Sequence, residues 1–470
     1  MRMYLAGEWV ERTAKIAVLN PYDGSTVDSV PSASLDDVEK ALASAEAGAR
    51  AMAGLAAHER YTVLHRAADL LVERSEEIAQ TITLEEGKIL AEARVEVQRA
   101  VQTITVSAEE AKRLYGETVP LDAAPSATGQ LGFTLRVPCG VVVAISPFNF
   151  PLNLVCHKVG PALAAGNAVI VKPASGTPLT ALKLVEILLE AGLPPMGVQA
   201  LTGPGGVIGD ALCADPRVRK ITFTGSQEVG EHICQVAGMK KITMELGSNC
   251  PLIVMPDADL EKVARATAAS GYANAGQVCI STQRVLVAGA VYADFLDALK
   301  PMVEAITTGN PMEESVRMGP LLTEGDAARV HEWVQEAVAG SARIVAGGEY
   351  TGTMYAPTIV ADVAPDTRIF RDELFGPVVG VTRFESMDQA IALANDSRYG
   401  LSAGVFTQDV DSAMRFVREA ESGNIHINGA PGWRADLMPY GGVKMSGMGK
   451  EGPRYAVQEM TELKMVVFHP

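Results

Sequence analysis

The stretch that decides the fold is residues 141–172, "VVVAISPFNFPLNLVCHKVGPALAAGNAVIVK". It opens with the apolar run "VVVAI", continues as an apolar helical segment that ends at Gly166, and closes with a second apolar run, "AVIVK". Strands that are continuously apolar rather than alternating are buried on both faces, as in parallel sheets that are covered by helices. The stretch therefore predicts a strand–helix–strand unit within a parallel sheet.

The alternation of strands and helices extends well beyond this unit. A helix is expected over 177–192, with Thr177 as its cap and Pro178 in its first position. Further strands are expected at "GVQAL", "KITFT" and "KITMEL". A second alternating region, from about 250 to 430, holds "PLIVM", "QRVLVAG", "ARIVAGG", "PVVGVTRF" and "SAGVFT". We therefore expect an α/β fold with two parallel sheets, and the first of these should bind ligands at the carboxyl ends of its strands.

Other parts of the chain fall outside this alternation. Residues 35–112 have apolar residues at helical spacing, and we expect helices there. Residues 120–136 are rich in Pro, Gly and Thr and predict one or two short strands instead. The final segment, "ELKMVVFHP", predicts one more strand.

Length, charge and cysteine content limit the class of protein. The chain has 470 residues, of which 48% are hydrophobic and 20% are charged, so it is long enough for about two to four domains. Its 40 basic and 56 acidic residues give a formal net charge of −16, which disfavours nucleic acid or an anionic membrane as a partner. No apolar run approaches the roughly 20 residues that span a bilayer, the N-terminus lacks a signal-peptide pattern, and the six cysteines are widely spaced. We therefore expect a cytoplasmic protein. Since His58 and His65 have no third ligand nearby, we expect no metal site.

One cysteine has the surroundings of a reactive thiol. In "AGQVCIST", Cys279 lies among small and polar residues, whereas buried structural cysteines usually have apolar neighbours. A thiol, with an ordinary pKa of about 8.5, needs a base and an oxyanion site for catalysis. Asn149 in "SPFNFP" follows the strand "VVVAI" and is a candidate oxyanion donor, and Glu245 ends "KITMEL" and is a candidate base. Considered alone, Asn149 is better explained as an ordinary turn residue, and Glu245 as a solvated acid at the end of a strand.

The ordered set of motifs is far more specific than any one residue. The motifs "SPFNFP", "VKPAS", "FTGS", "MELGS", "GQVCIS", "DELFGP" and "MPYGGVKMSGMG" resemble those of the NAD(P)-dependent aldehyde dehydrogenase superfamily, and the resemblance covers essentially the whole chain. By this resemblance Cys279 attacks the aldehyde carbon, and the amide of Asn149 and the backbone N–H of Cys279 hold the oxyanion. Hydride transfer to the nicotinamide leaves a thioester. Glu245 acts as the general base, which activates the thiol or the water that hydrolyses the thioester, and the product is a carboxylate.

The resemblance also implies a domain organisation. We expect the aldehyde dehydrogenase fold, with a Rossmann-like cofactor-binding domain formed by residues 1–119 and 137–247 and a catalytic domain formed by residues 248–430. Residues 120–136 and 455–470 would form a small β extension for oligomerisation. The expected assembly is a homodimer or a homotetramer.

NADP or NAD is the cofactor that the resemblance implies. The residues assigned to it are Ser146, Phe148, Lys172, Ser175, Gly225, Ser226, Leu246, Glu373 and Phe375. Lys172 would face the adenosine ribose, Ser226 would lie near the pyrophosphate, and Glu373 would bond the nicotinamide ribose. Many NAD-preferring relatives carry Glu where this chain has Ser175. Since the chain lacks that acid, we expect use of both cofactors.

His157 and Arg434 are the expected substrate residues. Relatives that act on carboxylated semialdehydes often carry Arg at the position of His157, and Ala273 replaces another Arg of the succinate-semialdehyde enzymes. Both departures argue against that substrate and favour a small, hydroxylated aldehyde. Arg434 and Arg99 could still anchor an anion, although a solvated surface role explains each at least as well.

Three other functions remain to be weighed. A CoA-acylating aldehyde dehydrogenase would use a thiol acceptor instead of water, but such relatives generally lack a Glu at position 245. A cysteine hydrolase would pair Cys279 with a histidine, and none lies close to it in the sequence. A non-catalytic relative of the family would have no need to keep Asn149, Glu245 and Cys279.

Overall fold

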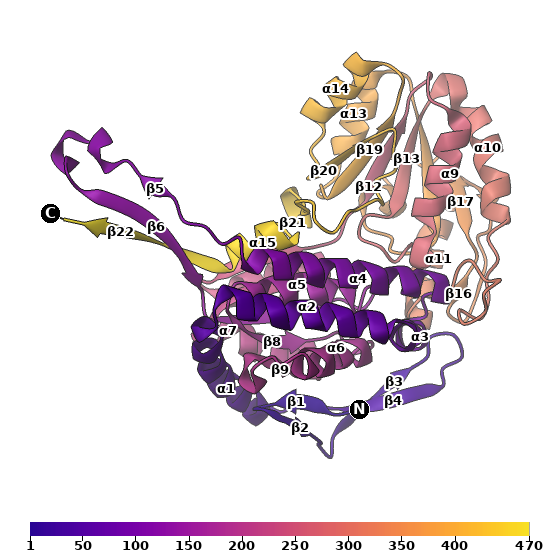
Figure 1. Cartoon of the computed structure of the whole chain (residues 1–470). Helices are drawn as coiled ribbons and strands as arrows, with labels where there is room; N and C mark the ends of the chain where they lie inside the picture. The colour runs from indigo at the N-terminus through magenta and orange to yellow at the C-terminus, as the bar shows by residue number, and fades with distance from the viewer. Residues whose placement is uncertain (470) are drawn as a thin grey trace.

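An eight-stranded sheet lies at the centre of the N-terminal half of the protein (Figure 1). In this computed structural model, which describes residues 1–469, its strands are β1 (Met3–Leu5), β2 (Glu8–Val10), β7 (Val141–Ile145), β8 (Ala168–Lys172), β9 (Val198–Ala200), β10 (Val218–Thr224), β11 (Lys241–Glu245) and β21 (Gly447–Met448). Their order is β2-β1-β9-β8-β7-β10-β11-β21, and the central strands from β9 to β11 run parallel. The strand–helix–strand unit predicted from residues 141–172 is confirmed.

Helices cover both faces of this sheet, which explains why its strands are apolar throughout. They are α1 (Leu35–Gly54), α2 (Ala57–Glu73), α3 (Ser75–Glu86), α4 (Leu90–Ala111), α5 (Asn153–Ala164), α6 (Leu179–Glu190), α7 (Asp210–Ala214) and α8 (Gln227–Ala237). In β7, Val142 and Ala144 pack in a core with α2 to α6. Val141, Val143 and Ile145 point the other way, into a core with α1, α7 and α8. Burial of one such valine or isoleucine side chain contributes roughly 1.5–3 kcal/mol.

The start of α6 differs from the sequence-based prediction. The helix begins at Leu179, Pro178 is its cap residue, and the hydroxyl of Thr177 donates to a neighbouring backbone carbonyl instead of capping the helix. The carboxyl group of Glu85, from α3, accepts the backbone N–H of Leu179 at 2.7 Å and that of Thr180 at 2.9 Å. A neighbouring helix therefore supplies the cap, because any buried acceptor in the right place can satisfy the first free N–H groups of a helix.

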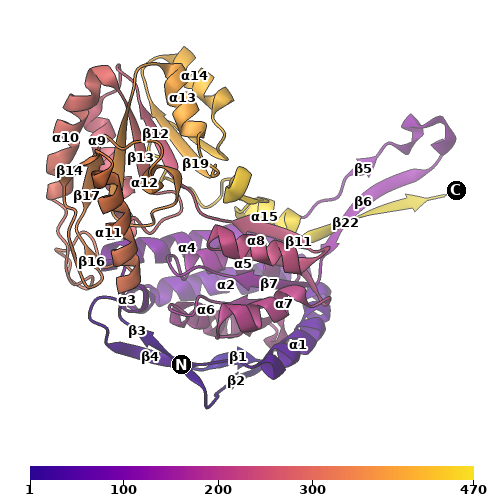
Figure 2. The same cartoon turned by 180° about the vertical axis from the view of Figure 1, so that it is seen from behind.

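A seven-stranded sheet forms the second half of the body (Figure 2). Its strands are β12 (Cys250–Val254), β13 (Thr282–Ala288), β14 (Arg343–Ala346), β17 (Thr358–Ala361), β18 (Val378–Phe384), β19 (Ser402–Phe406) and β20 (Asn424–Ile427). Their order is β14-β17-β18-β13-β12-β19-β20, and all run parallel except β14. The helices of this half are α9 (Leu260–Gly271), α10 (Tyr292–Glu304), α11 (Glu324–Ala339), α12 (Arg368–Arg371), α13 (Met387–Asn395) and α14 (Val410–Glu419).

After β20 the chain returns to the first sheet. The short strand β21 pairs antiparallel with β11, at the end of β11 that carries Glu245. Helix α15 (Pro453–Glu459) then packs against α4 and α5. This return brings the segment between β20 and β21 close to the carboxyl end of β11 in the first sheet and to the amino ends of β12 and β19 in the second sheet.

A long arm projects from the body in both views (Figures 1 and 2). Its strands are β5 (Thr118–Val119), β6 (Leu131–Pro138) and β22 (Thr461–Phe468), in the order β22-β6-β5. The boundaries differ from those expected. Residues 455–459 belong to α15, which begins with a proline that is favourable in a first helical turn, and residues 121–127 form 3₁₀ turns around two prolines.

Two small hairpins complete the fold. They are β3 (Lys15–Leu19) with β4 (Thr26–Pro31), and β15 (Tyr350–Thr351) with β16 (Met354–Tyr355). Across residues 1–469, none of the helices combines the length and the apolar character that a membrane crossing requires.

Candidate active site

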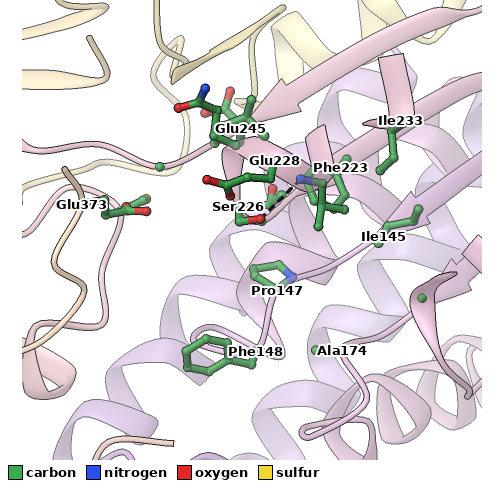
Figure 3. Close-up of a pocket in the computed structure, with 18 of the residues that line it drawn as sticks. Ile145, Pro147, Phe148, Ala174, Phe223, Ser226, Glu228, Ile233, Glu245 and Glu373 are labelled. Carbon is green, nitrogen blue, oxygen red and sulfur yellow. Dashed lines mark hydrogen bonds between the residues drawn. The ribbon is translucent and has the colours of Figure 1, made fainter. Parts of the chain in front are cut away.

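A cleft opens where the central strands of the first sheet end. Its cavity of about 930 Å³ is lined by residues that follow β7, β8, β10 and β11, and by Cys279 and Glu373 from the region of the second sheet. Parallel strands bring their carboxyl ends to one edge of a sheet, and ligands bind where the strand order reverses, here beside β7. Figure 3 shows Phe148, Ser226, Glu245 and Glu373 around this cleft.

Cys279 lies in a turn that leads into β13. The segment before it is irregular, because Asn274 and Ala275 adopt φ angles of 49° and 53°, which are uncommon for residues with a side chain. Gly276 approaches the backbone of Gly376 so closely that a Cβ would lie 2.0 Å from the Gly376 oxygen. Close packing therefore holds the segment before the cysteine in one conformation.

The thiol of Cys279 is half-buried and contacts one phenol. Its Sγ lies 3.2 Å from the hydroxyl oxygen of Tyr440. Burial raises the pKa of Cys279 to about 12, and the hydrogen bond with Tyr440 acts in the opposite direction. The resting group at pH 7 is therefore the neutral thiol, which needs a base to become a nucleophile.

Asn149 reaches from the first sheet to the cysteine segment. It lies in the turn after β7, and its Nδ2 donates to the backbone oxygen of Gln277 at 2.8 Å, just before Cys279. The backbone oxygen of Asn149 accepts a hydrogen bond of 2.7 Å from Nζ of Lys88, and Lys88 is paired with the buried Glu96. A primary amide has two N–H groups, so one remains for an oxygen beside the cysteine.

Glu245 ends β11 and lines the same cleft. Both of its carboxyl oxygens are buried and have no hydrogen-bond partner within the part of the chain that is described. Burial raises the pKa of Glu245 well above its usual value, and the nearby Glu451 raises it further. A Cβ on Gly441 would lie 2.8 Å from Oε1, so this glycine leaves room for the carboxyl group. Both oxygens of Glu245 are therefore available to a reactant, and the raised pKa makes the ionised carboxylate a stronger base than an exposed glutamate.

The residues expected to bind the cofactor line the cleft, with one exception. Those that line it are Ser146, Phe148, Lys172, Gly225, Ser226, Leu246, Glu373 and Phe375. Ser226 caps α8, since its Oγ accepts the backbone N–H of Val229 at 3.4 Å. The N-terminus of a helix favours anionic groups such as a pyrophosphate. Ser175 is the exception, since it does not line the cleft; its Oγ donates to the backbone oxygen of Gly203 at 3.1 Å.

The shape and chemistry of the cleft fit a dinucleotide. A Cβ on Gly225 would lie 2.4 Å from the ring of Phe223, so only glycine allows the close turn before α8. Burial lowers the pKa of Lys172 to about 8, which leaves it mostly protonated at pH 7. Glu373 accepts the backbone N–H of Ser248 at 2.9 Å, and burial raises its pKa to about 7. The cleft therefore offers a cation, a helix N-terminus and a carboxyl group along its length.

The sequence and the fold match those of known enzymes. Residues 9–466 match the model of the aldehyde dehydrogenase family. The chain belongs to the aldehyde dehydrogenase family. A 3-sulfolactaldehyde dehydrogenase from Priestia megaterium is 48% identical to it over 467 residues, 99% of this chain and 98% of that enzyme. A lactaldehyde dehydrogenase from Methanococcus aeolicus is 37% identical over 469 residues, 99% of each chain.

A solved structure shows the same fold along the whole chain. The crystal structure of an NADP-dependent enzyme from E. coli is 36% identical, with a TM-score of 0.97 over 99% of this chain and 98% of that chain. The protein is therefore an oxidoreductase that oxidises an aldehyde to the acid with NAD or NADP.

In this aldehyde dehydrogenase, His157 and Arg434 belong to a buried polar cluster outside the lining of the cleft. Nε2 of His157 donates to Asp436 at 2.9 Å, and Nη2 of Arg434 lies 3.2 Å from Nδ1 of His157. Burial, and then the charge of Arg434, lower the pKa of His157 to about 4, so it is neutral at pH 7. Arg434 also pairs with Glu451 at 3.1 Å, which is not a solvated surface role. Arg99 makes two hydrogen bonds to Asp436, so its charge is already paired.

Two contacts of this aldehyde dehydrogenase could not be found from the sequence. Tyr440, which bonds Cys279, lies inside the motif "MPYGGVKMSGMG", where a phenol among glycines is the only signal. Lys88, which holds the backbone of Asn149, follows an acidic helix end, and no local pattern separates a buried lysine from an exposed one.

Proposed function

We propose that this aldehyde dehydrogenase oxidises a small, hydroxylated aldehyde to its carboxylate through a thioester on Cys279. The observation that carries the proposal is the meeting of Cys279, Asn149 and Glu245 at the end of one cleft, from three separate parts of the chain. The relatives named for 3-sulfolactaldehyde and lactaldehyde, which are both 2-hydroxyaldehydes, support the substrate class.

Each of these residues has one role in the reaction. The carboxylate form of Glu245 takes the proton of Cys279, and the sulfur attacks the aldehyde carbon to give a thiohemiacetal. The developing oxyanion accepts hydrogen bonds from Nδ2 of Asn149 and from the backbone N–H of Cys279. NAD or NADP, when bound, supplies the hydride acceptor. Glu245 releases the first proton to solvent and then removes a proton from water, which attacks the thioester carbon, and the C–S bond breaks to release the carboxylate.

The cofactor assignment rests on the chemistry of the cleft. The residues proposed to bind it are Ser146, Phe148, Lys172, Ser175, Gly225, Ser226, Leu246, Glu373 and Phe375. The start of α8 with Ser226 would hold the pyrophosphate, and Glu373 would bond the ribose next to the nicotinamide. Ser175 brings no negative charge, and Lys172 brings a positive one, so both NAD and NADP are accepted.

His157 and Arg434 are proposed to contact the substrate. Nε of Arg434 is a buried donor that has no acceptor among residues 1–469. An oxygen of the substrate, such as the hydroxyl next to the aldehyde, would satisfy this donor. His157 is neutral and keeps Arg434 in place through the contact at Nδ1.

We assign cofactor binding to residues 1–119 and 137–247, and catalysis to residues 248–430. The arm, from 120–136 and the C-terminal strand β22, would pair subunits into a homodimer or a homotetramer. Apolar side chains exposed along the arm support this assignment; they are Leu131, Leu135, Leu463, Met465 and Phe468. The six cysteines are all free, which fits the cytoplasm.

A panel of aldehydes tests the proposed reaction. The purified enzyme should increase the absorbance at 340 nm with 2-hydroxyaldehydes and either cofactor, and it should do so without CoA. Activity that appears only when CoA is added would favour the acylating reaction instead.

Cys279→Ser tests the nucleophile. This variant should lose oxidation while it still binds the cofactor, because a hydroxyl is a far weaker nucleophile than a thiolate. The matched control is Cys139→Ser, since Cys139 only donates to Asn167 at 3.2 Å and should remain active when changed. Retention of more than a few per cent of kcat by Cys279→Ser would refute the mechanism.

A further inference from the structure

The hydroxyl of Tyr440 lies against the sulfur of Cys279. The two atoms are 3.2 Å apart, and neither makes another hydrogen bond within residues 1–469. Tyr440 is 2% exposed, so water does not compete for this contact. A phenol group that is buried usually has a hydrogen-bond partner, and here the partner is the atom that reacts.

The neighbours of Tyr440 hold its ring in place. The backbones of Tyr440 and Glu451 exchange hydrogen bonds of 3.1 and 2.7 Å. The carboxylate of Glu451 pairs with Arg434, whose guanidinium carbon lies 3.8 Å from the centre of the Tyr440 ring. Backbone, carboxylate, guanidinium and ring therefore form a closed set of contacts around the tyrosine. A cation over the ring also draws electron density from the phenol and makes its O–H a better donor.

We propose that Tyr440 is a further catalytic residue, whose O–H donates a hydrogen bond to the sulfur of Cys279 whenever that sulfur is a thiolate. This inference rests on the proposed role of Cys279 as the nucleophile. Asn149 and the backbone N–H of Cys279 are the proposed donors to the substrate oxygen, and Tyr440 is a donor to the sulfur.

The thiolate forms twice in each catalytic cycle. In the first step the S–H proton passes to Glu245, the electron pair stays on sulfur, and Tyr440 donates to that sulfur until it bonds to the aldehyde carbon. In the last step water has added to the thioester, the C–S bond breaks, and its electron pair returns to the sulfur of Cys279. Tyr440 stabilises this leaving thiolate and loses no proton, because burial raises the pKa of Tyr440 well above its usual value.

The other charged groups near the sulfur cannot replace this contact. Glu245 and Glu373 raise the pKa of Cys279, whereas Arg434 lowers it without bonding the sulfur directly. Asn149 donates one N–H to the backbone of Gln277, and its second N–H is assigned to the substrate oxygen. Tyr440 is therefore the donor side chain that stabilises a negative sulfur in the described site.

Tyr440→Phe removes only the hydroxyl and keeps the ring beneath Arg434. We expect the thiolate fraction of Cys279 to fall about 10- to 100-fold at a given pH, as for loss of one hydrogen bond to a charged group. A more basic thiolate is also more reactive, with a Brønsted coefficient of about 0.5, so iodoacetamide should alkylate Cys279 about 3- to 10-fold more slowly. The rate is measured by mass spectrometry of the peptide that contains Cys279. We expect kcat/KM to fall by about the same factor or more.

Two further variants separate a catalytic from a structural role. Tyr292→Phe is the matched control, because it removes another buried hydroxyl, which lies 2.9 Å from Asp362 and away from the cleft. It should leave both rates unchanged. Tyr440→3-fluorotyrosine keeps the hydroxyl and makes it a stronger donor. Alkylation of Cys279 should therefore be faster in this variant, whereas it should be slower in Tyr440→Phe.

The outcomes distinguish this inference from the proposed function. Equal alkylation rates and equal kcat/KM in wild type and Tyr440→Phe would overturn the role of Tyr440, even where Cys279→Ser is inactive. An active Cys279→Ser enzyme would instead overturn the proposed mechanism. Slower alkylation in Tyr440→Phe with unchanged NADP binding and thermal melting would support the inference, because a purely structural loss would change the last two.

Discussion

Replacing Ser175 with glutamate should weaken the binding of NADP to this enzyme. Ser175 is half-buried just after β8, and its hydroxyl donates to the backbone oxygen of Gly203. A glutamate there would accept hydrogen bonds from both hydroxyls of an adenosine ribose, but it would repel a 2′-phosphate. The serine of this chain exerts no such repulsion, and its hydroxyl could donate to the phosphate only by giving up its bond to Gly203.

The size of the effect follows from the charges. At a separation of about 5 Å and an effective dielectric of about 20, the glutamate and the phosphate repel each other by roughly 3 kcal/mol per unit charge. Because Ser175 is partly exposed, solvent and salt screen part of this energy. We therefore expect KM for NADP to rise roughly 10- to 100-fold, whereas KM for NAD stays the same or falls.

Lys172 adds a pH dependence to the same prediction. Burial lowers the pKa of Lys172 to about 8, so it is charged at pH 7 and becomes neutral as the pH rises through 8. Loss of this positive charge should weaken binding of the 2′-phosphate. KM for NADP should therefore increase between about pH 7 and about pH 9 more steeply than KM for NAD.

Steady-state kinetics at 340 nm with both cofactors provide the assay. Ser175→Gln is the control, since glutamine has the size of glutamate without its charge. If the two variants raised KM for NADP equally, steric exclusion would explain the effect. A wild-type kcat/KM for NAD a hundredfold above that for NADP would refute the reasoning.

Two more predictions concern the catalytic residues. Asn149→Ala should lower kcat roughly 100- to 1000-fold, the usual cost of one oxyanion donor, with little change in thermal melting; nearly unchanged turnover would leave Asn149 as a turn residue only. Glu245→Gln should slow both proton transfers, from the thiol of Cys279 and from water. Any thioester that forms should hydrolyse slowly, so mass spectrometry of a quenched reaction should show the substrate acyl group on Cys279. Wild-type turnover in this variant would contradict the role of Glu245 as the base.

The central sheet could be predicted from local sequence. The run 141–145 has no polar face, and a strand of that kind is stable only when helices cover both sides. Val142 and Val143 do point into different cores. The continuous apolar run therefore indicates that both faces of the strand are buried. Burial on both faces requires helices on each side of the sheet, which is the layered α/β arrangement.

Features that depend on contacts between distant segments could not be predicted in the same way. Thr177 is a residue type that often caps helices. In this protein Glu85, from another helix, accepts the first N–H groups of α6 instead. The C-terminal part of the β extension was expected from residue 455, yet α15 occupies the chain up to Glu459 and β22 begins at Thr461. In each case packing decided between alternatives that local sequence leaves nearly equal in energy.

The sequence by itself determined which residues reach the edge of the sheet. Asn149 and Glu245 each lie at or just after the end of a parallel strand, and such ends converge whatever the rest of the chain does. Only the tertiary structure decided what surrounds the thiol. Tyr440 lies 161 residues from Cys279 in the chain, and its hydroxyl meets the sulfur because the segment after β20 turns back to the first sheet. The direction of one hydroxyl depends on that return and on the packing of Arg434 over the ring, which no local pattern encodes.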